Sequence, residues 1–435
     1  MTRPTRTSFA AALAAVALAY SLAFAQHEHH QPAPAPEQQA PEGPAVRLED
    51  LEKSALANSP AVREAEAAVR EAEGRARQAG LYPNPTAGYT GEEIRTGPQT
   101  RGGQHGFFVE QTIVLGGKLS KRRDVVLEEV KKAQADLDVA SVRVRGAVRL
   151  AYFQALSAAR RVEILERLAA LVDEAVATSN GLYNVGQADR PDVLEIEIEA
   201  RQAELQLARA RAGLDLARQQ LAIVSGDPAA AGARLEGSLE DALPRVEPTR
   251  LAEILERGPQ LASARASVER AQARVRAERA ERIPDLAVRG GAQYNRELLE
   301  ATNAPVGWQG LAEVGVEIPI FDRNQGAIAA AEAEVEIAEA EVRRLELGVR
   351  SRFTTAYSTY QTAQKTAEVY KTEILPKADQ AYRLYLEKYQ QMTAAYPQVL
   401  IARRTWLQVN LDYLDALEEL YRAALPLEGF LLDSP

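Results

Sequence analysis

Three histidines early in the chain are the residues of this sequence best suited to hold a metal ion: His27, His29 and His30. Imidazole nitrogens are ligands that Zn, Cu, Ni and Co accept. The surrounding segment, residues 26–46, is rich in Pro and polar residues, which predicts a disordered tether. His105 is the remaining histidine, and no closed set of four ligands accompanies the cluster. The segment is therefore either a metal-capturing tether or a polar linker that binds nothing.

Other reactive groups are scarce in this sequence. The chain has no Cys, which excludes disulfides and thiolate chemistry. It contains no G-x-S-x-G, H-E-x-x-H or P-loop pattern, so no hydrolase, zinc-protease or nucleotide site is indicated. The net charge of −9 and the pI near 5.4 argue against a nucleic-acid partner. We expect neither enzyme activity nor a cofactor.

The first 25 residues have the pattern of a secretory signal peptide. Arg3 and Arg6 precede an apolar, Ala-rich run that ends in small residues at Ala25, which predicts cleavage after Ala25. No Cys follows the cut, so a lipoprotein anchor is not indicated. No later apolar run approaches the roughly 20 residues that a membrane helix needs. Any membrane contact must then come from β-strands.

A short interruption between helical patterns occurs twice, as "YNVGQADRPDVL" and as "YQQMTAAYPQVL". At one constant offset, Tyr183 aligns with Tyr389 and Pro191 with Pro397. Such internal repetition indicates a duplicated structural unit. The predicted organisation is a first repeat at 47–225, a connector at 226–247, a second repeat at 248–425 and a C-terminal tail at 426–435.

The helical stretches carry a coiled-coil pattern. Apolar residues, many of them Ala, recur at alternating steps of four and three, as in Val126, Val130, Ala133 and Leu137. This period places them on one seam and favours helical hairpins with a left-handed supercoil. Gln154 and Arg161 occupy seam positions, so we expect the packing to loosen around them.

The lengths of the helices predict how they pair. Long helices are expected at about 117–183 and 323–389, each roughly 100 Å at 1.5 Å per residue. Two shorter helices stacked end to end would match each one, 47–81 with 190–224 and 248–282 with 397–424. The two interruptions are then hairpin tips, at about 184–190 and 390–396.

Glycine and capping residues fit the expected reversals of the chain. Gly116 and Gly117 permit a sharp return from strand to helix, and Gly186 can form a left-handed turn at the first tip. Asp189 is placed to cap the helix that follows this tip.

Four segments have the alternating pattern of strands, at about 86–96, 106–115, 285–296 and 311–320. Alternation over about ten residues is typical of an outer-membrane barrel, although a half-buried sheet of a soluble protein has the same period. Four strands are too few, because the smallest membrane barrels use about eight. Three chains would supply twelve.

The duplicated unit resembles the TolC-like outer-membrane factors of tripartite efflux systems, over nearly the whole chain after the signal. Two motifs, "YPNPT" at 82–86 and "VLGGKLSKRR" at 114–123, are similar to the heavy-metal, CzcC-like branch. The resemblance implies a mostly α protein with a small β part, a homotrimer whose four strands per chain close a twelve-stranded outer-membrane barrel. This barrel would contact outer-membrane lipid and continue into a periplasmic tube of helical hairpins.

The resemblance also implies partners and contact residues. The tips would meet a periplasmic adaptor (membrane fusion) protein that is coupled to a proton-driven inner-membrane pump of the RND type. The tip residues expected to contact the adaptor are Val185, Gly186, Gln187, Ala188, Met392, Thr393, Ala394 and Ala395.

A gate near the tips is a further implication of the resemblance, and it falls on Asp192 and Tyr389. The two aspartates that better-known members carry after the second tip are replaced here by Gln398 and Ile401. Glu195 follows Asp192 by three residues and shares its helical face. We hypothesise that this pair supplies the entrance carboxylates; the alternative is a solvated charged face.

Three glutamates of the strand segments would face water if the apolar side chains face lipid: Glu110, Glu313 and Glu317. They would favour passage of cations, unless Arg289 neutralises them.

The predicted function is a passive outer-membrane exit duct, extending into the periplasm, for divalent heavy-metal cations. One alternative is a channel for drugs or other small molecules. Another is a periplasmic coiled-coil adaptor, which would need neither the duplication nor the strands.

Overall fold

The computed structural model describes residues 45–94, 103–186, 189–240, 243–299, 302, 304–391 and 396–430. The helices are α1 (Leu48–Asn58), α2 (Pro60–Ala79), α3 (Lys118–Asn184), α4 (Arg190–Ser225), α5 (Arg250–Arg257), α6 (Pro259–Ala280), α7 (Gln325–Val369), α8 (Leu375–Gln390) and α9 (Tyr396–Leu425). The strands are β1 (Ala45–Val46), β2 (Thr86–Glu92), β3 (Gln104–Ile113), β4 (Arg234–Leu235), β5 (Leu286–Leu298) and β6 (Pro305–Val316). Short turns of helix are η1 (Pro228–Ala231), η2 (Tyr370–Ile374) and η3 (Pro426–Phe430). The prediction of a mostly helical chain with a small β part is confirmed.

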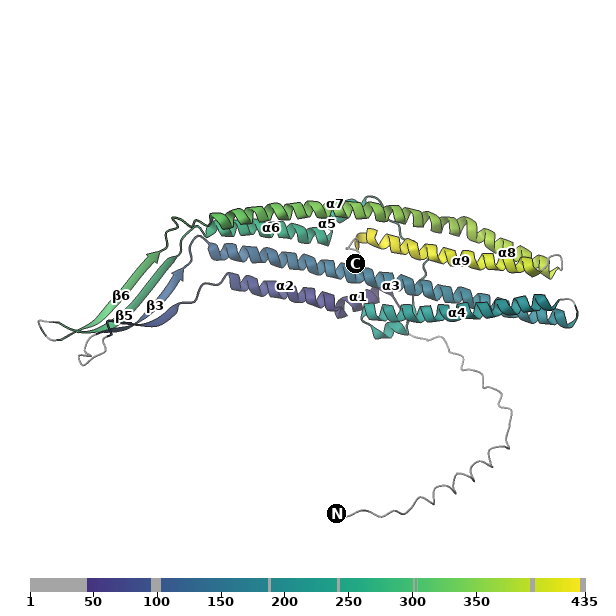
Figure 1. The fold of residues 1–435 in the computed structure, drawn as a ribbon, viewed down its shortest axis with the longest axis horizontal. Helices are drawn as coiled ribbons and strands as arrows, with labels where there is room; N and C mark the ends of the chain where they lie inside the picture. The colour runs from purple at the N-terminus through teal and green to yellow at the C-terminus, as the bar shows by residue number, and fades with distance from the viewer. Residues whose placement is uncertain are drawn as a thin grey trace, which may run out of the picture. The chain divides into compact units, whose positions relative to one another are not determined.

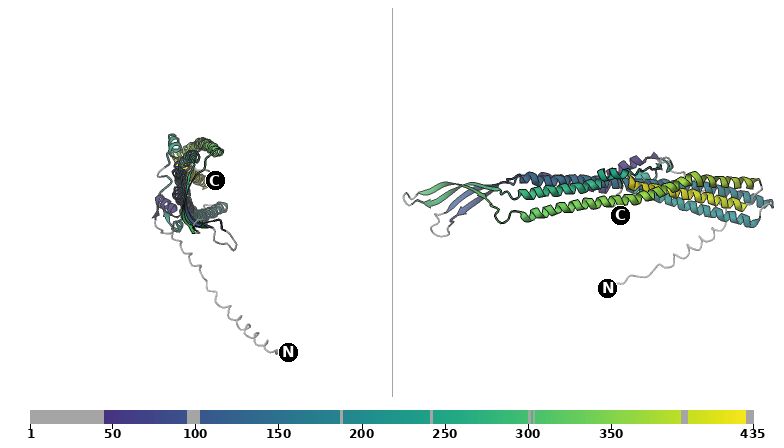
Figure 2. Two further views of the ribbon diagram at one scale, coloured as in Figure 1. Left: turned by 90° about the vertical axis from the view of Figure 1, so that its left-hand side faces the viewer. Right: turned by 90° about the horizontal axis from the view of Figure 1, so that it is seen from above.

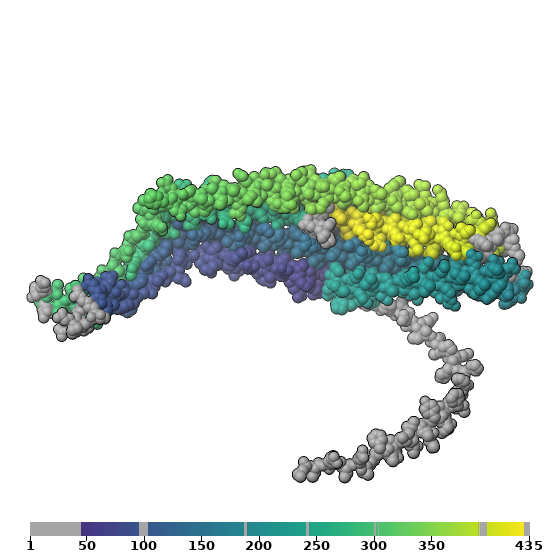
Figure 3. Space-filling view, in the orientation of Figure 1, coloured from purple at the N-terminus to yellow at the C-terminus, as the bar shows by residue number. Residues whose placement is uncertain are grey.

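The element order is the same in both halves of the described chain: two short helices, two strands, a long helix and a returning helix (Figure 1). The helices of both copies run side by side, and the sheet extends from one end of them (Figure 2). The α9 segment packs against α7, α8 and α3, and in the space-filling view it lies between the second copy's long helix and the helices of the first copy (Figure 3).

The helix α3 has 67 residues and so spans roughly 100 Å. It packs against α1 and α2 over one part of its length and against α4 over another. In the second copy, α6 packs on α7, while α9 packs on both α7 and α8. This is the predicted pairing of one long helix with two stacked shorter ones.

The long helix of the second copy is not the regular helix that its sequence predicts. Tyr370–Ile374 is a π-helical turn between α7 and α8. Pro376 follows it, and a proline inside a helix lacks the amide hydrogen and clashes with the carbonyl one turn earlier. A π-turn widens the helix at this point and accommodates the proline. The sequence of α3 has no proline, and α3 continues without such a turn.

The four long strands form one antiparallel sheet in the order β2-β3-β5-β6. The β3–β5 pairing, from Gln104 opposite Asn295 to Ile113 opposite Leu286, joins the two copies. The strand β6 begins earlier and ends earlier than predicted, so Glu317 lies after the strand, in the connection to α7.

One face of this sheet is apolar and exposed. Alternate residues across the strands share it because successive side chains point to opposite faces. Five of its large side chains are more than half exposed: Tyr89, Phe107, Val109, Trp308 and Val314. The opposite face carries Glu110, Arg289 and Glu313. Within the described residues, no helix has the length and apolar character to cross a membrane.

The main core lies where α1, α3, α7, α9 and the connector meet. Leu239 of the connector is buried, and the Tyr421 hydroxyl donates a hydrogen bond to its carbonyl (3.0 Å). A second cluster packs Val162, Leu165 and Val172 of α3 against small residues of α4.

Both ends of the described chain join the packed unit further than predicted. Ala45 and Val46, the last residues of the expected tether, pair as β1 with β4 of the connector. Leu427, in the segment expected as a tail, is fully buried. The connector therefore pairs with the two residues Ala45 and Val46 that lie shortly before α1.

A buried lysine joins the copies where strand becomes helix. Gly116 and Gly117 have φ of +70° and +68°, which confirms the predicted sharp return into α3. Lys118 is 4% exposed, and its ammonium lies 2.9 Å from Asp285 and 3.6 Å from Glu281 of the second copy. The Leu115 amide also donates to Asp285 (3.0 Å). The Asp285 carboxylate therefore binds Leu115 before the turn and Lys118 after it.

Two buried tyrosines offer a matched test of what holds the connector. The Tyr360 hydroxyl donates to the Pro244 carbonyl (2.9 Å) and accepts from the Val246 amide (3.2 Å), whereas the buried Tyr413 hydroxyl has no hydrogen-bond partner among the described residues. We expect Tyr360→Phe to lower the unfolding free energy by about 1–3 kcal/mol because it leaves both backbone groups unpaired. Tyr413→Phe should be neutral or stabilising. Thermal unfolding of the purified variants measures both, and equal losses would contradict the assignment.

The stability should also depend on pH through Tyr413. Burial, and then the charges of Glu240 and Tyr421, raise the pKa of Tyr413 to about 12. The unfolded chain ionises this phenol near its ordinary pKa of about 10, so stability is lost as pH rises from about 10 to about 12, by up to about 3 kcal/mol. The test is the unfolding free energy of the native protein and of Tyr413→Phe, each measured at about pH 10 and at about pH 12. A parallel pH dependence in the two proteins would show that Tyr413 does not contribute.

Candidate functional site

The tips are the points where each long helix turns back. At the first tip, α3 ends at Asn184, and Val185 and Gly186 follow, both exposed. Gly186 has φ of +76°, the left-handed turn that its position predicts. The expected tip residues Gln187, Ala188, Met392, Thr393, Ala394 and Ala395 lie outside the described residues.

The start of α4 is held differently from the prediction. Asp189 is the N-cap residue, but its side chain makes no capping hydrogen bond, so its predicted role as a side-chain cap is wrong. Pro191 lies in the first turn, where its missing amide costs no helical hydrogen bond. The Arg190 guanidinium lies 5.9 Å from the centre of the Tyr183 ring and so connects the two sides of the tip.

Two predicted gate residues lie on different hairpins, each near its tip. Tyr389, at the end of α8, is partly buried, while Asp192, in the first turn of α4, is exposed. Burial, and then the negative charge of Asp192, raise the pKa of Tyr389. Glu195 is exposed one turn further along α4. Asp192 and Tyr389 thus belong to different hairpins, and the charge of Asp192 acts on the Tyr389 phenol across them.

A buried ion pair that the sequence analysis missed follows one turn later. Glu199 of α4 and Arg403 of α9 are 7% and 2% exposed, and the Arg403 Nη2 lies 2.5 Å from the Glu199 Oε2. Arg404 lies at 4.0 Å from the other carboxylate oxygen. The Tyr382 and Trp406 rings pack close by, with centroids 5.9 Å apart. Buried charges are costly unless paired, so this contact constrains α4 and α9 relative to each other.

One signal in the sequence points to Glu199. Asp192, Glu195 and Glu199 follow steps of three and four, the spacing of a single helical face. The buried carboxylate is thus the third of a row whose first two are exposed. No spacing rule points to Arg403, because it lies on another helix far along the chain.

The two tips are not equivalent in their packing. Leu194 is 43% exposed, whereas Leu400 at the aligned position is 3% exposed. Gln398 is exposed, and Ile401 is 64% exposed, at the two positions where relatives were expected to carry aspartates. The second tip therefore presents an amide and an apolar side chain there.

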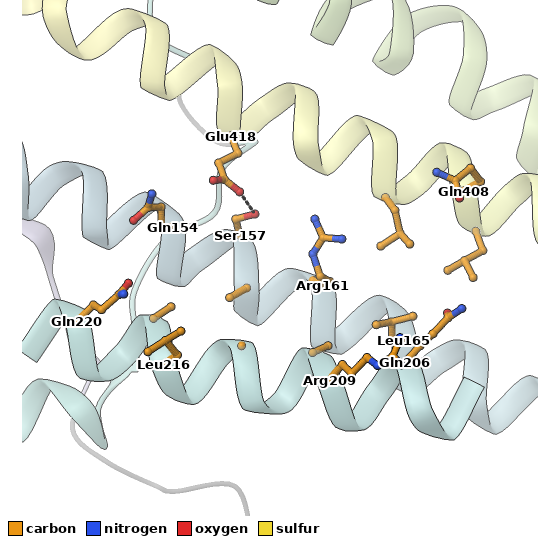
Figure 4. Close-up of a pocket in the computed structure, with 16 residues that line it drawn as sticks. Gln154, Ser157, Arg161, Leu165, Gln206, Arg209, Leu216, Gln220, Gln408 and Glu418 are labelled. Atoms are coloured by element: carbon orange, nitrogen blue, oxygen red, sulfur yellow. Dashed lines mark hydrogen bonds between the residues drawn. The ribbon is translucent and has the colours of Figure 1, made fainter. Parts of the chain in front are cut away.

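A groove lies beside the positions that interrupt the seam. Gln154 and Arg161, where looser packing was predicted, line a groove of about 540 Å³ between α3, α4 and α9. Figure 4 shows Gln206, Arg209 and Gln220 of α4 on one side and Gln408 and Glu418 of α9 on the other. The Ser157 hydroxyl bridges the groove by donating to Glu418 (3.1 Å).

The glutamates expected to face a lumen occupy two kinds of position. Glu110 of β3 and Glu313 of β6 lie opposite Arg289 of β5, on the polar face of the sheet. Glu317 is exposed after the end of β6. The histidine cluster His27, His29 and His30 lies outside the described residues. The part of the chain that the structure describes contains no group of three or more His, Cys, Asp or Glu placed to hold a metal ion.

Comparison with known proteins identifies the architecture. A family model described as "Outer membrane efflux protein" matches twice, over residues 51–227 and 251–431, in keeping with the duplication. The chain belongs to the outer membrane efflux protein family. This is a family of transport channels and not of enzymes, which confirms that part of the prediction.

Comparisons with individual proteins support the assignment to this family. The chain is 30% identical, over 81% of its length and 82% of the relative's, to the cobalt-zinc-cadmium resistance protein CzcC of Cupriavidus metallidurans. Its fold is similar to that of a membrane protein from Pseudomonas aeruginosa, with a TM-score of 0.72, 20% identity, and coverage of 93% of this chain and 99% of the other. The fold of CusC gives a TM-score of 0.71 at 17% identity, covering 89% and 92% of the two chains. The predicted resemblance to TolC-like efflux factors of the heavy-metal branch is confirmed.

Removing one partner of the buried ion pair should destabilise this efflux protein strongly. We expect Glu199→Gln to lower the unfolding free energy by about 3–5 kcal/mol, because Arg403 keeps its charge in a buried position. The matched control is Glu204→Gln, which breaks the exposed Arg201–Glu204 pair on the same helix and should cost less than about 1 kcal/mol. Thermal unfolding of both variants tests this, with Glu199→Leu/Arg403→Met expected to recover most of the loss. Equal effects of the two single changes would refute it.

Proposed function

We propose that this protein is the passive outer-membrane exit channel of a tripartite efflux system for divalent heavy-metal cations. The observation that carries the proposal is the 30% identity to a cobalt-zinc-cadmium resistance protein over most of both chains. The substrate class is transferred from that relative. The chain has no nucleotide-binding motif, so in this proposal the energy for transport comes from a separate inner-membrane pump.

A trimer is proposed because one chain leaves the sheet incomplete. The strands β2 and β6 are the edges of the four-stranded sheet, and unpaired edges with an exposed apolar face are unfavourable for an isolated chain. Three copies joined edge to edge would make a barrel of twelve strands. The face with Tyr89, Phe107 and Trp308 would then contact lipid, with aromatic side chains at an interface where such rings are favoured.

The helical hairpins would continue this barrel into the periplasm, with the tips toward the inner membrane. A periplasmic adaptor protein would dock on the tips, where Val185 is 68% exposed. In this arrangement Asp192 and Glu195 supply carboxylates at the entrance, and an interaction between Asp192 and Tyr389 would hold it closed. A signal peptide removed after Ala25 would direct the chain to this location.

Sensitivity to metals tests the substrate. A strain that lacks the gene should become sensitive to divalent metals among Zn, Co, Cd, Ni and Cu salts, and the intact gene should restore growth. A drug panel is the control. Sensitivity to drugs and detergents alone would overturn the metal assignment in favour of a small-molecule efflux channel.

Conductance tests the gate. In planar bilayers, Tyr389→Phe should raise the open probability of the channel. The double variant Asp192→Asn/Glu195→Gln should weaken block by divalent cations, because carboxylates at the entrance attract these ions. Glu204→Gln, further along α4, is the matched control. Unchanged block in the double variant would show that these carboxylates lie on a solvated face without a role at the entrance.

A further inference from the structure

A charged triplet crosses the polar face of the sheet at a single level. Glu110 of β3 pairs directly with Arg289 of β5, and Arg289 pairs directly with Glu313 of β6. The Arg289 Nη1 lies 3.9 Å from the Glu313 Oε2. The Arg289 guanidinium thus lies between two carboxylates on neighbouring strands, and the three side chains together carry one net negative charge per chain.

Packing holds the arginine in place. Its guanidinium carbon lies 3.8 Å from the centre of the Phe108 ring, the geometry of a cation–π contact. The ring in turn covers Gly88, where a Cβ atom would come within 2.5 Å of it. Glycine at this position therefore allows Phe108 to lie flat on the sheet beneath the arginine.

The Glu313 and Arg289 side chains differ in their exposure to solvent. The Glu313 side chain is 65% exposed, whereas that of Arg289 is 29% exposed. The carboxylate therefore projects toward solvent while the guanidinium stays close to the sheet. The neighbouring residues of the opposite face, Val109 and Val314, are apolar and more than half exposed.

We propose that Arg289 sets the charge selectivity of the channel by neutralising one of the two glutamates. The inference rests on the proposed function, in which this face lines a water-filled lumen. With Arg289 present, the remaining negative charge favours cations over anions. The guanidinium also keeps the two carboxylates from acting together on a doubly charged ion, so a hydrated divalent cation passes without being retained.

The test is ion selectivity of the purified full-length protein in planar bilayers. The native channel should prefer cations in a salt gradient, and Zn²⁺ should block it weakly. Arg289→Gln should increase the cation preference and lower the Zn²⁺ concentration for half block by roughly tenfold, equivalent to about 1.4 kcal/mol. Arg289→Lys keeps the charge and should behave as the native channel. Arg296→Gln, a loss of positive charge near the end of the same strand, is the matched control and should change neither quantity.

A second variant tests the proposal without disturbing the arginine and its ring. Glu313→Gln removes the most exposed carboxylate, and the preference for cations should fall sharply, because Glu110 and Arg289 then cancel. Unchanged selectivity in Glu313→Gln, or in a channel-forming Arg289→Gln, would overturn the proposal and leave the triplet a purely structural link between strands. Absence of any conductance from the native protein would instead count against the proposed channel function.

Discussion

The pairing of β3 with β5 is the contact on which the rest of this structure depends. It joins the two copies of a duplicated unit into one antiparallel sheet, and its register decides which residues of the two copies meet. Because of that register, Glu110 faces Arg289, and the turn at Gly116 meets the start of β5. Without it, each copy would have only a two-stranded hairpin, which is marginally stable by itself.

Buried ion pairs link the two copies at both ends of the helices. Lys118 bonds to Asp285 where the helices meet the sheet, and Glu199 bonds to Arg403 near the tips. Each pair joins residues from different copies. Such pairs add little net stability relative to well-packed apolar residues, but they penalise any arrangement that separates them. They are therefore suited to fixing the alignment of long, Ala-rich helices that could otherwise slide past each other.

The two copies differ in their long helices and at their tips. The second long helix contains the π-turn at Tyr370–Ile374, and the first does not. Leu194 is exposed, but its counterpart Leu400 is buried. The two hairpins of the duplicated unit thus contribute different surfaces to the tip region. A ring built from three chains would alternate between the two kinds of hairpin.

Sequence periodicity and turn residues determined the architecture of this protein. Steps of three and four predicted long paired helices, alternation predicted four strands, and Gly116, Gly117 and Gly186 predicted the sharp turns, because these signals depend on neighbouring residues. The π-turn before Pro376, the missing cap at Asp189 and the end of β6 before Glu317 were not predicted, since each depends on how local preferences balance against packing.

Only the tertiary structure decided which distant residues touch. From the sequence alone, Arg289 is only a group that could neutralise any of three glutamates, and the register of the strands placed it opposite Glu110 and Glu313. Arg403 was not identified by the sequence analysis. Its pairing with Glu199 depends on the burial of both side chains in the fold, which the spacing of residues along the chain does not show. Local order is encoded in the spacing of residues along the chain, whereas an ion pair between helices exists only once the register of the whole fold has been set.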